Sequence, residues 1–146
     1  MLARKPGYYC DGEAVVTETG ANPRDVLTIA AEPLSEKHYA AFPVALAAWA
    51  IRAGTSAGGY CSACNAPWAR VIGGTAEAWL PTCSCPGPPP PRRPRVLDCF
   101  CGSGRTGIAA QRLGCDFIGI DLSEAYADMA RRLLCDDMPL FAGLEG

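Results

Sequence analysis

Two groups of residues in this chain have the types and the spacing that chemistry requires. In the first, the aspartates Asp98 and Asp121 stand before and after a glycine-rich stretch. In the second, four cysteines form a Cys-x-x-Cys pair and, about 18 residues further on, a Cys-x-Cys pair. Acids beside a glycine-rich turn are typical of sites for nucleoside-bearing cofactors, and two close cysteine pairs are typical of metal sites.

Residues 95–121 predict a strand, a glycine-rich turn, a helix and a second strand. An apolar run is interrupted at residues 102–104, where glycines permit positive φ and a close approach of the backbone to a ligand. Apolar residues at helical spacing predict a helix over residues 105–113, which Gly114 ends, and residues 117–120 predict the next strand. In such a unit the cofactor lies at the strand ends, where Asp121 is placed to hold ribose hydroxyls.

Two classes of cofactor fit this stretch. Gly102, Gly104 and Gly107 satisfy the G-x-G-x-x-G pattern, and Asp121 follows at the distance typical of NAD- and FAD-binding units. However, Asp98 lies four residues before the first glycine, where its carboxylate would repel a pyrophosphate. A cofactor with an ammonium, a sulfonium and no phosphate would instead be attracted, which favours S-adenosylmethionine (SAM). A nicotinamide or flavin oxidoreductase and a glycine-rich turn without a ligand are the alternatives.

The segments D-C-F-C-G-S-G-R-T-G (residues 98–107) and F-I-G-I-D (residues 117–121) resemble the SAM-binding motif of the amino-methylating DNA methyltransferases. These enzymes methylate adenine N6 or cytosine N4, and the resemblance is to the subgroup whose cofactor motif lies near the carboxy terminus. The family usually has Pro where this chain has Cys99 and Thr where it has Arg105. Neither difference removes a glycine or the acid, and the similarity extends from about residue 25 to residue 140.

The resemblance implies an α/β fold of the Rossmann-like class I SAM-dependent methyltransferase type, of which this chain holds part of the sheet. It implies that Asp98 contacts the ammonium of SAM, that Asp121 holds the ribose and that Leu122 lies beside the adenine. The loop between them would wrap the methionine through Phe100, Gly102, Ser103, Gly104 and Thr106. The activity implied is site-specific DNA methylation, as in restriction-modification, with DNA as the partner.

A second segment of the resemblance precedes this unit. Residues 25–29 predict a strand, and residues 43–52 predict a helix with Leu46, Ala47, Ala50 and Ile51 on its apolar face and Gly54 as its stop. The family has a Thr-bearing strand and then His-x-Ala-x-Phe-Pro, which closes over the methionyl part of SAM. The residues that match, and that would line the pocket, are Thr28, His38, Phe42 and Pro43.

The start of this helix suits an anion, because free N–H groups near Pro43 are available to the cofactor carboxylate. Phe42 is alternatively a core aromatic residue, which is the interpretation we favour for Trp49. His38 is the one histidine of the chain, and a hydrogen-bonding or positioning role is favoured for it over that of a base.

The catalytic tetrapeptide of the family, Asp, Asn or Ser followed by Pro-Pro-Tyr or Pro-Pro-Trp, does not occur in the sequence. In this subgroup it precedes the cofactor region. We therefore expect a carboxy-terminal part of a larger enzyme, with a missing amino-terminal catalytic half as a partner. Such a chain would bind the cofactor without transferring the methyl group alone.

The cysteine pairs match the spacing of a four-thiolate zinc site. The zinc would be structural, since a four-thiolate site leaves no position for water, and would organise a knuckle-like insert. A reduced cluster, two local disulfides, or a zinc-dependent DNA-binding or interaction module with a vestigial cofactor site are the alternatives. The four predicted ligands are Cys61, Cys64, Cys83 and Cys85.

The composition limits the possible partners and the cellular compartment of the chain. The chain is 49% hydrophobic with a net charge of −2, so any surface for DNA must be local. It has no apolar run of transmembrane length and no secretory signal, which predicts a cytoplasmic protein without a membrane partner. Its nine cysteines are then thiols or metal ligands rather than disulfides, and those at positions 99, 101, 115 and 135 are expected to be small core residues.

Four segments follow from these features. Residues 1–24 are expected to be poorly structured, with residues 14–17 as the one candidate strand. Residues 25–56 form the cofactor-closing strand and helix, and residues 57–94 the cysteine-rich insert with its proline-rich, extended linker. Residues 95–146 form the SAM-binding β-α-β-α unit, whose last helix is predicted over residues 123–134 with Ser123 as its N-cap.

Overall fold

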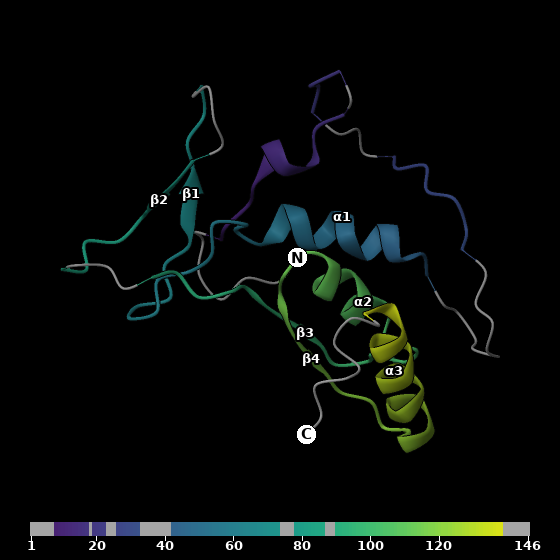
Figure 1. Cartoon of the computed structure of the whole chain (residues 1–146). Helices are drawn as coiled ribbons and strands as arrows, with labels where there is room; N and C mark the ends of the chain where they lie inside the picture. Colours follow the sequence, from purple (N-terminus) through teal and green to yellow (C-terminus); the bar gives the residue numbers. More distant parts are fainter. Residues whose placement is uncertain are drawn as a thin grey trace. The chain divides into compact units, whose positions relative to one another are not determined.

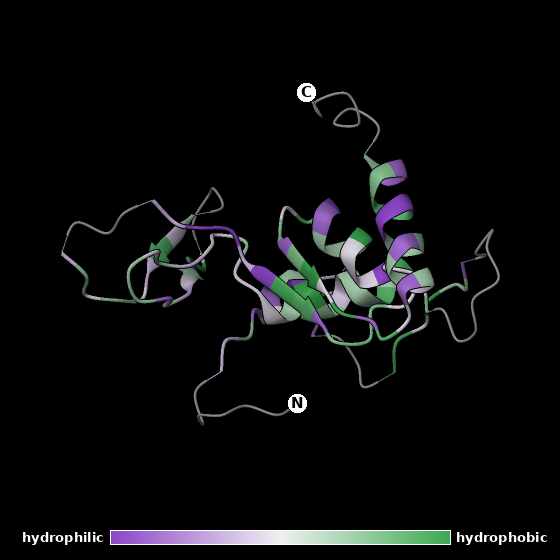
Figure 2. Cartoon of the chain, turned by 90° about the horizontal axis from the view of Figure 1, so that it is seen from below, coloured by the Kyte–Doolittle hydropathy of each residue, from purple (hydrophilic) through white to green (hydrophobic). Residues whose placement is uncertain are grey.

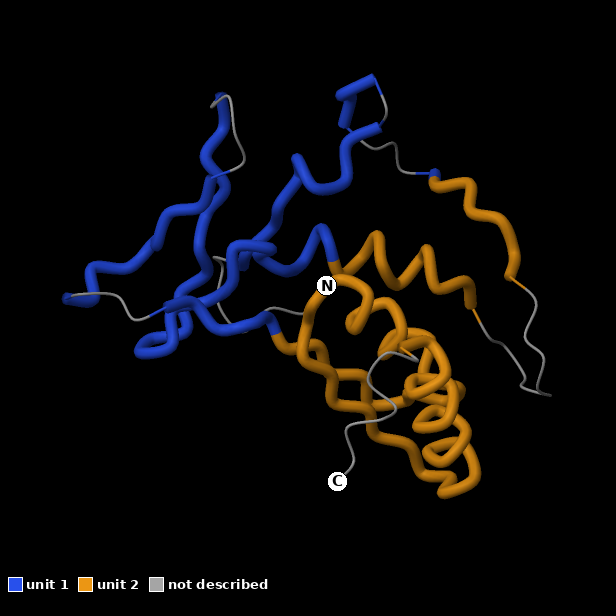
Figure 3. The backbone as a smooth tube through the Cα atoms, viewed as in Figure 1, with its two compact units in different colours: residues 1–26, 52–94 blue, residues 27–51, 95–146 orange. Residues whose placement is uncertain are grey.

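The computed structural model describes residues 8–17, 19–22, 26–32, 42–73, 78–86 and 90–138. The chain divides into two compact units (Figures 1 and 3). Unit 1 consists of residues 1–26 and 52–94, and unit 2 consists of residues 27–51 and 95–146. Within these described ranges each unit contains one two-stranded sheet, so the chain is mixed α/β, as the sequence predicts.

Unit 2 is built on a parallel strand–helix–strand motif. Strand β3 (Arg95–Asp98) is followed by helix α2 (Arg105–Arg112) and strand β4 (Asp116–Gly119), and the register places Asp98 opposite Gly119. Apolar residues occupy the middle of both strands (Figure 2), and charged residues stand at both ends of β3 and at the start of β4. This confirms the predicted order of elements, with the second strand beginning one residue early. Gly114 follows the helix with a φ of 68°, as expected of a glycine stop.

The core of unit 2 lies between the helices and one face of this sheet. Helix α1 (Val44–Gly54) contributes Val44, Ala47 and Ile51, which face buried residues of α2, namely Ile108, Ala109 and Ala110. The predicted apolar face of α1 is half wrong, because Leu46 is 40% exposed and Ala50 is exposed. The helix is apolar almost all round, so its hydrophobic pattern does not select a single face.

Helix α3 (Glu124–Asp137) runs three residues beyond its predicted end and packs on α2. A Cβ atom added at Gly104 would lie 2.9 Å from the Cβ of Ala130 on α3, and one added at Gly107 would lie 2.7 Å from the ring of Phe117. The second and third glycines of the fingerprint therefore permit close packing between elements, whatever they do for a ligand.

Unit 1 contains an antiparallel hairpin of β1 (Trp68–Arg70) and β2 (Trp79–Pro81). Arg70 donates to the buried carboxylate of Asp11 through Nε (3.1 Å) and Nη2 (3.0 Å) and lies over the ring of Trp79. The sequence did not predict these strands, since three residues are too few to display an alternating pattern.

Two predicted strands are wrong. The strand expected over residues 14–17 is replaced by a 3-10 helix, η1 (Gly12–Val15). Of the strand expected over residues 25–29, residues 26–29 have no regular secondary structure, and residue 25 lies outside the described residues. In the described part of unit 2, β3 pairs only with β4, so this apolar segment has no strand partner.

The proline-rich linker is tied to the rest of unit 1. The N–H of Arg92 donates to the carbonyl of Tyr60 (2.9 Å), and the N–H of Tyr60 donates back to the carbonyl of Arg92 (3.0 Å). None of the described helices has the length and apolar character needed to cross a bilayer.

The tight contact at Gly104 generates a stability prediction. Changing Gly104 to Ala should destabilise the chain more than changing Gly114 to Ala, because both have positive φ but only Gly104 faces a neighbouring backbone and Cβ. The Gly114 variant should cost about 1–2 kcal/mol, the strain of a left-handed alanine. Urea unfolding measures both, and equal losses would contradict the packing role of Gly104.

Candidate functional site

Asp98 ends β3 and holds the loop that follows it. Its Oδ1 accepts a hydrogen bond from the N–H of Phe100 (3.0 Å), and its Oδ2 accepts one from Oγ1 of Thr106 (2.6 Å). Thr106 lies in the first turn of α2, where a carboxylate is favoured by the positive end of the helix dipole. Asp98 thus ties the end of the strand to the start of the helix.

Asp121 plays the matching part after β4. Its Oδ2 accepts from the N–H of Gly102 (2.8 Å), and its Oδ1 accepts from the N–H of Ser123 (2.9 Å). Ser123 occupies the N-cap position of α3, as predicted, but its side chain makes no capping bond. The carboxylate of Asp121 therefore fixes both the glycine-rich loop and the residue that precedes α3.

The two carboxylates lie at the same edge of the sheet. The N–H of Ile120 donates to the carbonyl of Asp98 (2.8 Å), and the N–H of Cys101 donates to the carbonyl of Ile120 (3.0 Å), which joins the two strand ends. A carboxylate has about four lone-pair sites, which is more than the two bonds named above for each aspartate. The sequence predicted both positions, but not that both acids hold the loop.

The surroundings of the acids are apolar and exposed. Phe100 is 91% exposed and Leu122 is fully exposed, whereas Ser103 and Gly104, within the loop, are buried. Burial, followed by the Asp121 and Asp98 carboxylates, raises the pKa of the Cys101 thiol. This edge therefore offers carboxylate acceptors beside two apolar side chains and a neutral thiol.

The charge of the loop tests which cofactor it suits. Arg105 is the one basic residue between Asp98 and Gly107, and its Nη1 donates to Oε2 of Glu32 (2.7 Å) while the side chain is buried. Its guanidinium is thus engaged with a carboxylate. Because carboxylates flank the loop, the charge of the site fits a positively charged cofactor without phosphate better than it fits a dinucleotide.

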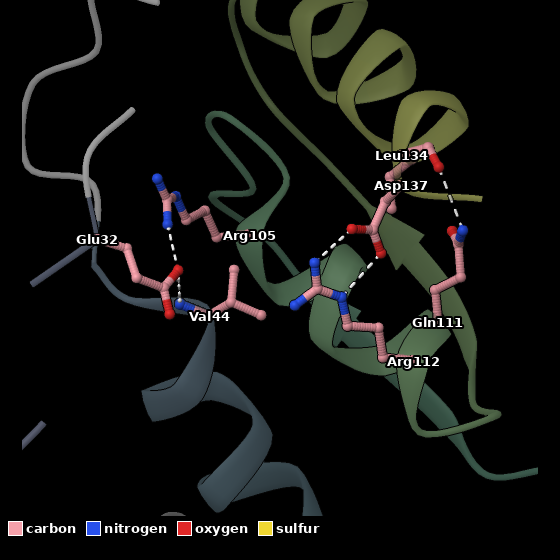
Figure 4. A network of polar contacts seen from close by, with 7 residues as sticks. All are labelled: Glu32, Val44, Arg105, Gln111, Arg112, Leu134 and Asp137. Carbon is pink, nitrogen blue, oxygen red and sulfur yellow. Dashed lines mark hydrogen bonds and ion pairs between the residues drawn. The ribbon is translucent and has the colours of Figure 1, made fainter. Parts of the chain in front are cut away.

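Glu32 was not singled out from the sequence. Its Oε2 also accepts from the N–H of Val44 (3.1 Å) at the start of α1, so it contacts the beginnings of both α1 and α2 (Figure 4). Of the helix N–H groups expected to be free for a ligand, that of Val44 is occupied by Glu32. The one signal in the sequence is Arg105 itself, a basic residue at a position where the resembling family usually has Thr.

The other predicted cofactor residues lie in the preceding segment of unit 2. Thr28 is exposed in the irregular residues 26–32, Phe42 is 40% exposed, and Pro43 immediately precedes α1. His38 lies outside the described residues. The Glu32–Arg105 pair links this segment to the first residue of α2.

The four predicted zinc ligands come together in unit 1. The Sγ atoms of Cys61, Cys64, Cys83 and Cys85 all lie within 4.8 Å of one another. Tetrahedral zinc with Zn–S bonds of about 2.3 Å separates its sulfurs by about 3.8 Å, so the cluster has nearly that size. The four thiols are free, which does not favour the alternative of two local disulfides.

A turn presents the first cysteine pair. The N–H of Asn65 donates to the carbonyl of Cys61 (2.9 Å), and Asn65 adopts a φ of 65° that asparagine tolerates. Backbone hydrogen bonds at Cys64 and Ala63 lower the pKa of Cys61 to about 7, whereas hydrogen bonds with the Cys64 and Cys83 side chains raise the pKa of Cys85 to about 12. Cys61 and Cys85 therefore differ in acidity although they lie in one cluster.

Comparison with known proteins agrees with the resemblance predicted from the sequence. Residues 91–132, which contain the β3–α2–β4 motif and the start of α3, match the model of the DNA methylase family of N6 and N4 methyltransferases. The type II methyltransferase M.SmaI of Serratia marcescens is 29% identical over 138 residues, and these are 90% of this chain and 35% of that enzyme. The type II methyltransferase M2.DpnII of Streptococcus pneumoniae is 54% identical over 39 residues, which are 27% of this chain and 15% of that enzyme.

A third relative covers a share of the chain between those of the first two. The type II methyltransferase M.SfiI of Streptomyces fimbriatus is 29% identical over 107 residues, or 73% of this chain and 17% of that enzyme. The chain thus spans about a third or less of the length of these curated relatives.

Proposed function

We propose that this chain is the SAM-binding part of a DNA amino-methyltransferase, which its similarity to the DNA methylase family and to M.SmaI supports. The observation that carries the proposal is the pair of carboxylates, Asp98 and Asp121, at one edge of a parallel strand pair on either side of a glycine-rich loop. The β3–α2–β4 motif is, in this proposal, the first part of a Rossmann-like class I methyltransferase sheet.

Each group at this edge has a part in holding the cofactor. Asp98 receives the ammonium of the methionine moiety, and Asp121 accepts from the ribose hydroxyls with its remaining lone pairs. Phe100 and Leu122 lose their exposed apolar surface against the cofactor, with Leu122 beside the adenine. Thr28, His38, Phe42 and Pro43 cover the methionyl part, and residues 100–106 wrap it. SAM supplies an electrophilic methyl group when bound.

The substrate in this proposal is DNA, and the acceptor is the exocyclic amine of adenine or cytosine. A base inside a duplex is out of reach of an active site, so the target base must be flipped out. Its amine is a poor nucleophile because its lone pair is delocalised into the ring. Methyl transfer therefore requires a Pro-Pro-Tyr or Pro-Pro-Trp segment to hold the amine and stack on the base, and these 146 residues contain none.

We propose further that the four cysteines of unit 1 hold one structural zinc ion. Their sulfurs are clustered, and all four protein ligands of a closed tetrahedral site are present in one unit. The insert has short strands and a small core, so metal binding would contribute to its folding free energy.

The choice of cofactor is tested by calorimetric titration. The chain should bind SAM and give no signal with NADH, because Asp98 repels phosphate. Changing Asp121 to Ala should weaken SAM binding by about 1.5–3 kcal/mol, the scale of a hydrogen bond to a charged group. Asp116→Ala, at the opposite end of the same strand pair, is the matched control and should leave the affinity unchanged. A chain that binds NADH and does not bind SAM would favour the oxidoreductase alternative.

The metal site is tested by elemental analysis of protein purified without added zinc, which should contain about one equivalent. Cys64→Ser should lose the zinc and make residues 60–85 more sensitive to protease, because the ligands then lose the ion that joins their two turns. Cys135→Ser, which removes an exposed thiol from α3, should retain it. Metal-free wild-type protein with the same protease resistance as the Cys64 variant would refute the zinc proposal.

Methyl transfer is tested with tritiated SAM and unmethylated DNA. The 146-residue chain alone should incorporate no label, since positioning and electrostatic contributions of several kcal/mol each are missing with the catalytic segment. Adding the amino-terminal half of a related enzyme that carries Pro-Pro-Tyr or Pro-Pro-Trp is the complementary arm. Robust incorporation by the chain alone would contradict the assignment of the catalytic segment.

A further inference from the structure

Arg105 stands at a costly position for a cation. It is the first residue of α2 and its side chain is buried, with about 7% of its surface exposed. A positive charge at the amino end of a helix is opposed by the helix dipole, and burial of a charge without a counter-ion is unfavourable. The carboxylate of Glu32, at 2.7 Å from Nη1, offsets both costs.

Glu32 connects this arginine to the segment before α1. The same oxygen, Oε2, accepts from the N–H of Val44 at 3.1 Å, and Val44 directly follows Phe42 and Pro43 (Figure 4). One carboxylate therefore contacts both the N–H that begins α1 and the arginine that begins α2. A carboxylate is favourable at the start of α1 and neutralises the cation at the start of α2.

We propose that Glu32 and Arg105 are positioning residues that hold the segment around Thr28, Phe42 and Pro43 over the cofactor loop. This inference rests on the proposed function and adds a specificity to it. The pair governs affinity for the methionyl part of SAM, whereas Asp121 and Leu122 govern affinity for the adenosine part. A threonine at position 105 is too short and carries no charge to engage Glu32, so this link depends on the arginine.

The test compares SAM with adenosine on the whole chain. Glu32→Ala should weaken SAM binding about tenfold or more, the scale of one lost charge-assisted hydrogen bond, and change adenosine binding less than twofold. Arg105→Lys, which keeps the charge, should lie between the wild type and the Glu32 variant. Hydrogen exchange should quicken at the start of α1 in the Glu32 variant without ligand, because Val44 loses its acceptor.

The matched control lies on the same helix. Arg112, at the other end of α2, donates through Nε to Oδ2 of Asp137 on α3 (2.9 Å). Arg112→Gln removes an ion pair of the same type and should leave both ligand affinities and the exchange at Val44 unchanged (Figure 4).

Each result decides between the proposals. Selective loss of SAM affinity in the Glu32 variant, with the control unchanged, supports the positioning role. Equal losses for SAM and adenosine, or none for either, overturn that role while the proposed function stands. If the wild-type chain does not bind SAM, whether or not it binds adenosine, the proposed function is overturned and the positioning role with it.

Discussion

The candidate site lies at the edge of the sheet where β3 and β4 end, and it depends on the hydrogen bond from the N–H of Gly102 to the carboxylate of Asp121. This bond joins the loop after β3 to the end of β4, and the same carboxylate holds Ser123 before α3. Asp98 makes the equivalent connection between β3 and α2 through Thr106. Two like charges at one edge repel each other, and each is stabilised by two donors that the loop or a helix start supplies. The same two carboxylates therefore fix the conformation of the loop and give this edge of the sheet its negative charge.

That acidity is what links the fold to a choice of ligand. A glycine-rich loop before a helix is commonly a phosphate site, because its N–H groups and the helix dipole attract anions. Here Asp98 and Asp121 accept N–H or hydroxyl donors of the loop, and Arg105 is paired with Glu32. The resulting edge favours a cation, and the similarity of residues 91–132 to the DNA methylase family supports the same interpretation.

The sequence predicted the elements whose signals are local. The order strand, loop, helix and strand over residues 95–121, the stop at Gly114 and the meeting of four cysteines all follow from residue types at short spacing. The strand expected over residues 25–29 was wrong because pairing, not apolar character, decides whether a strand forms. The β1–β2 hairpin was missed because its strands have three residues each, which is too short for an alternating pattern. The Glu32–Arg105 pair was missed because partners 73 residues apart leave no periodic signal in the sequence. At Ser123 the N-cap position was predicted correctly, but its side chain makes no capping bond, and Asp121 accepts from its N–H.

The central claim, that the acidic edge selects a cationic nucleoside cofactor, is tested most directly by amide chemical shifts of ¹⁵N-labelled protein during titration with SAM. The largest changes should fall on residues 98–106 and 121–123, with the amides of Gly102 and Ser123 among them, because their acceptor is the carboxylate that we propose to hold the ribose. Titration with NADH should leave these amides unchanged. Shifts produced by NADH at Gly102 and Ser123, with none produced by SAM, would contradict the account.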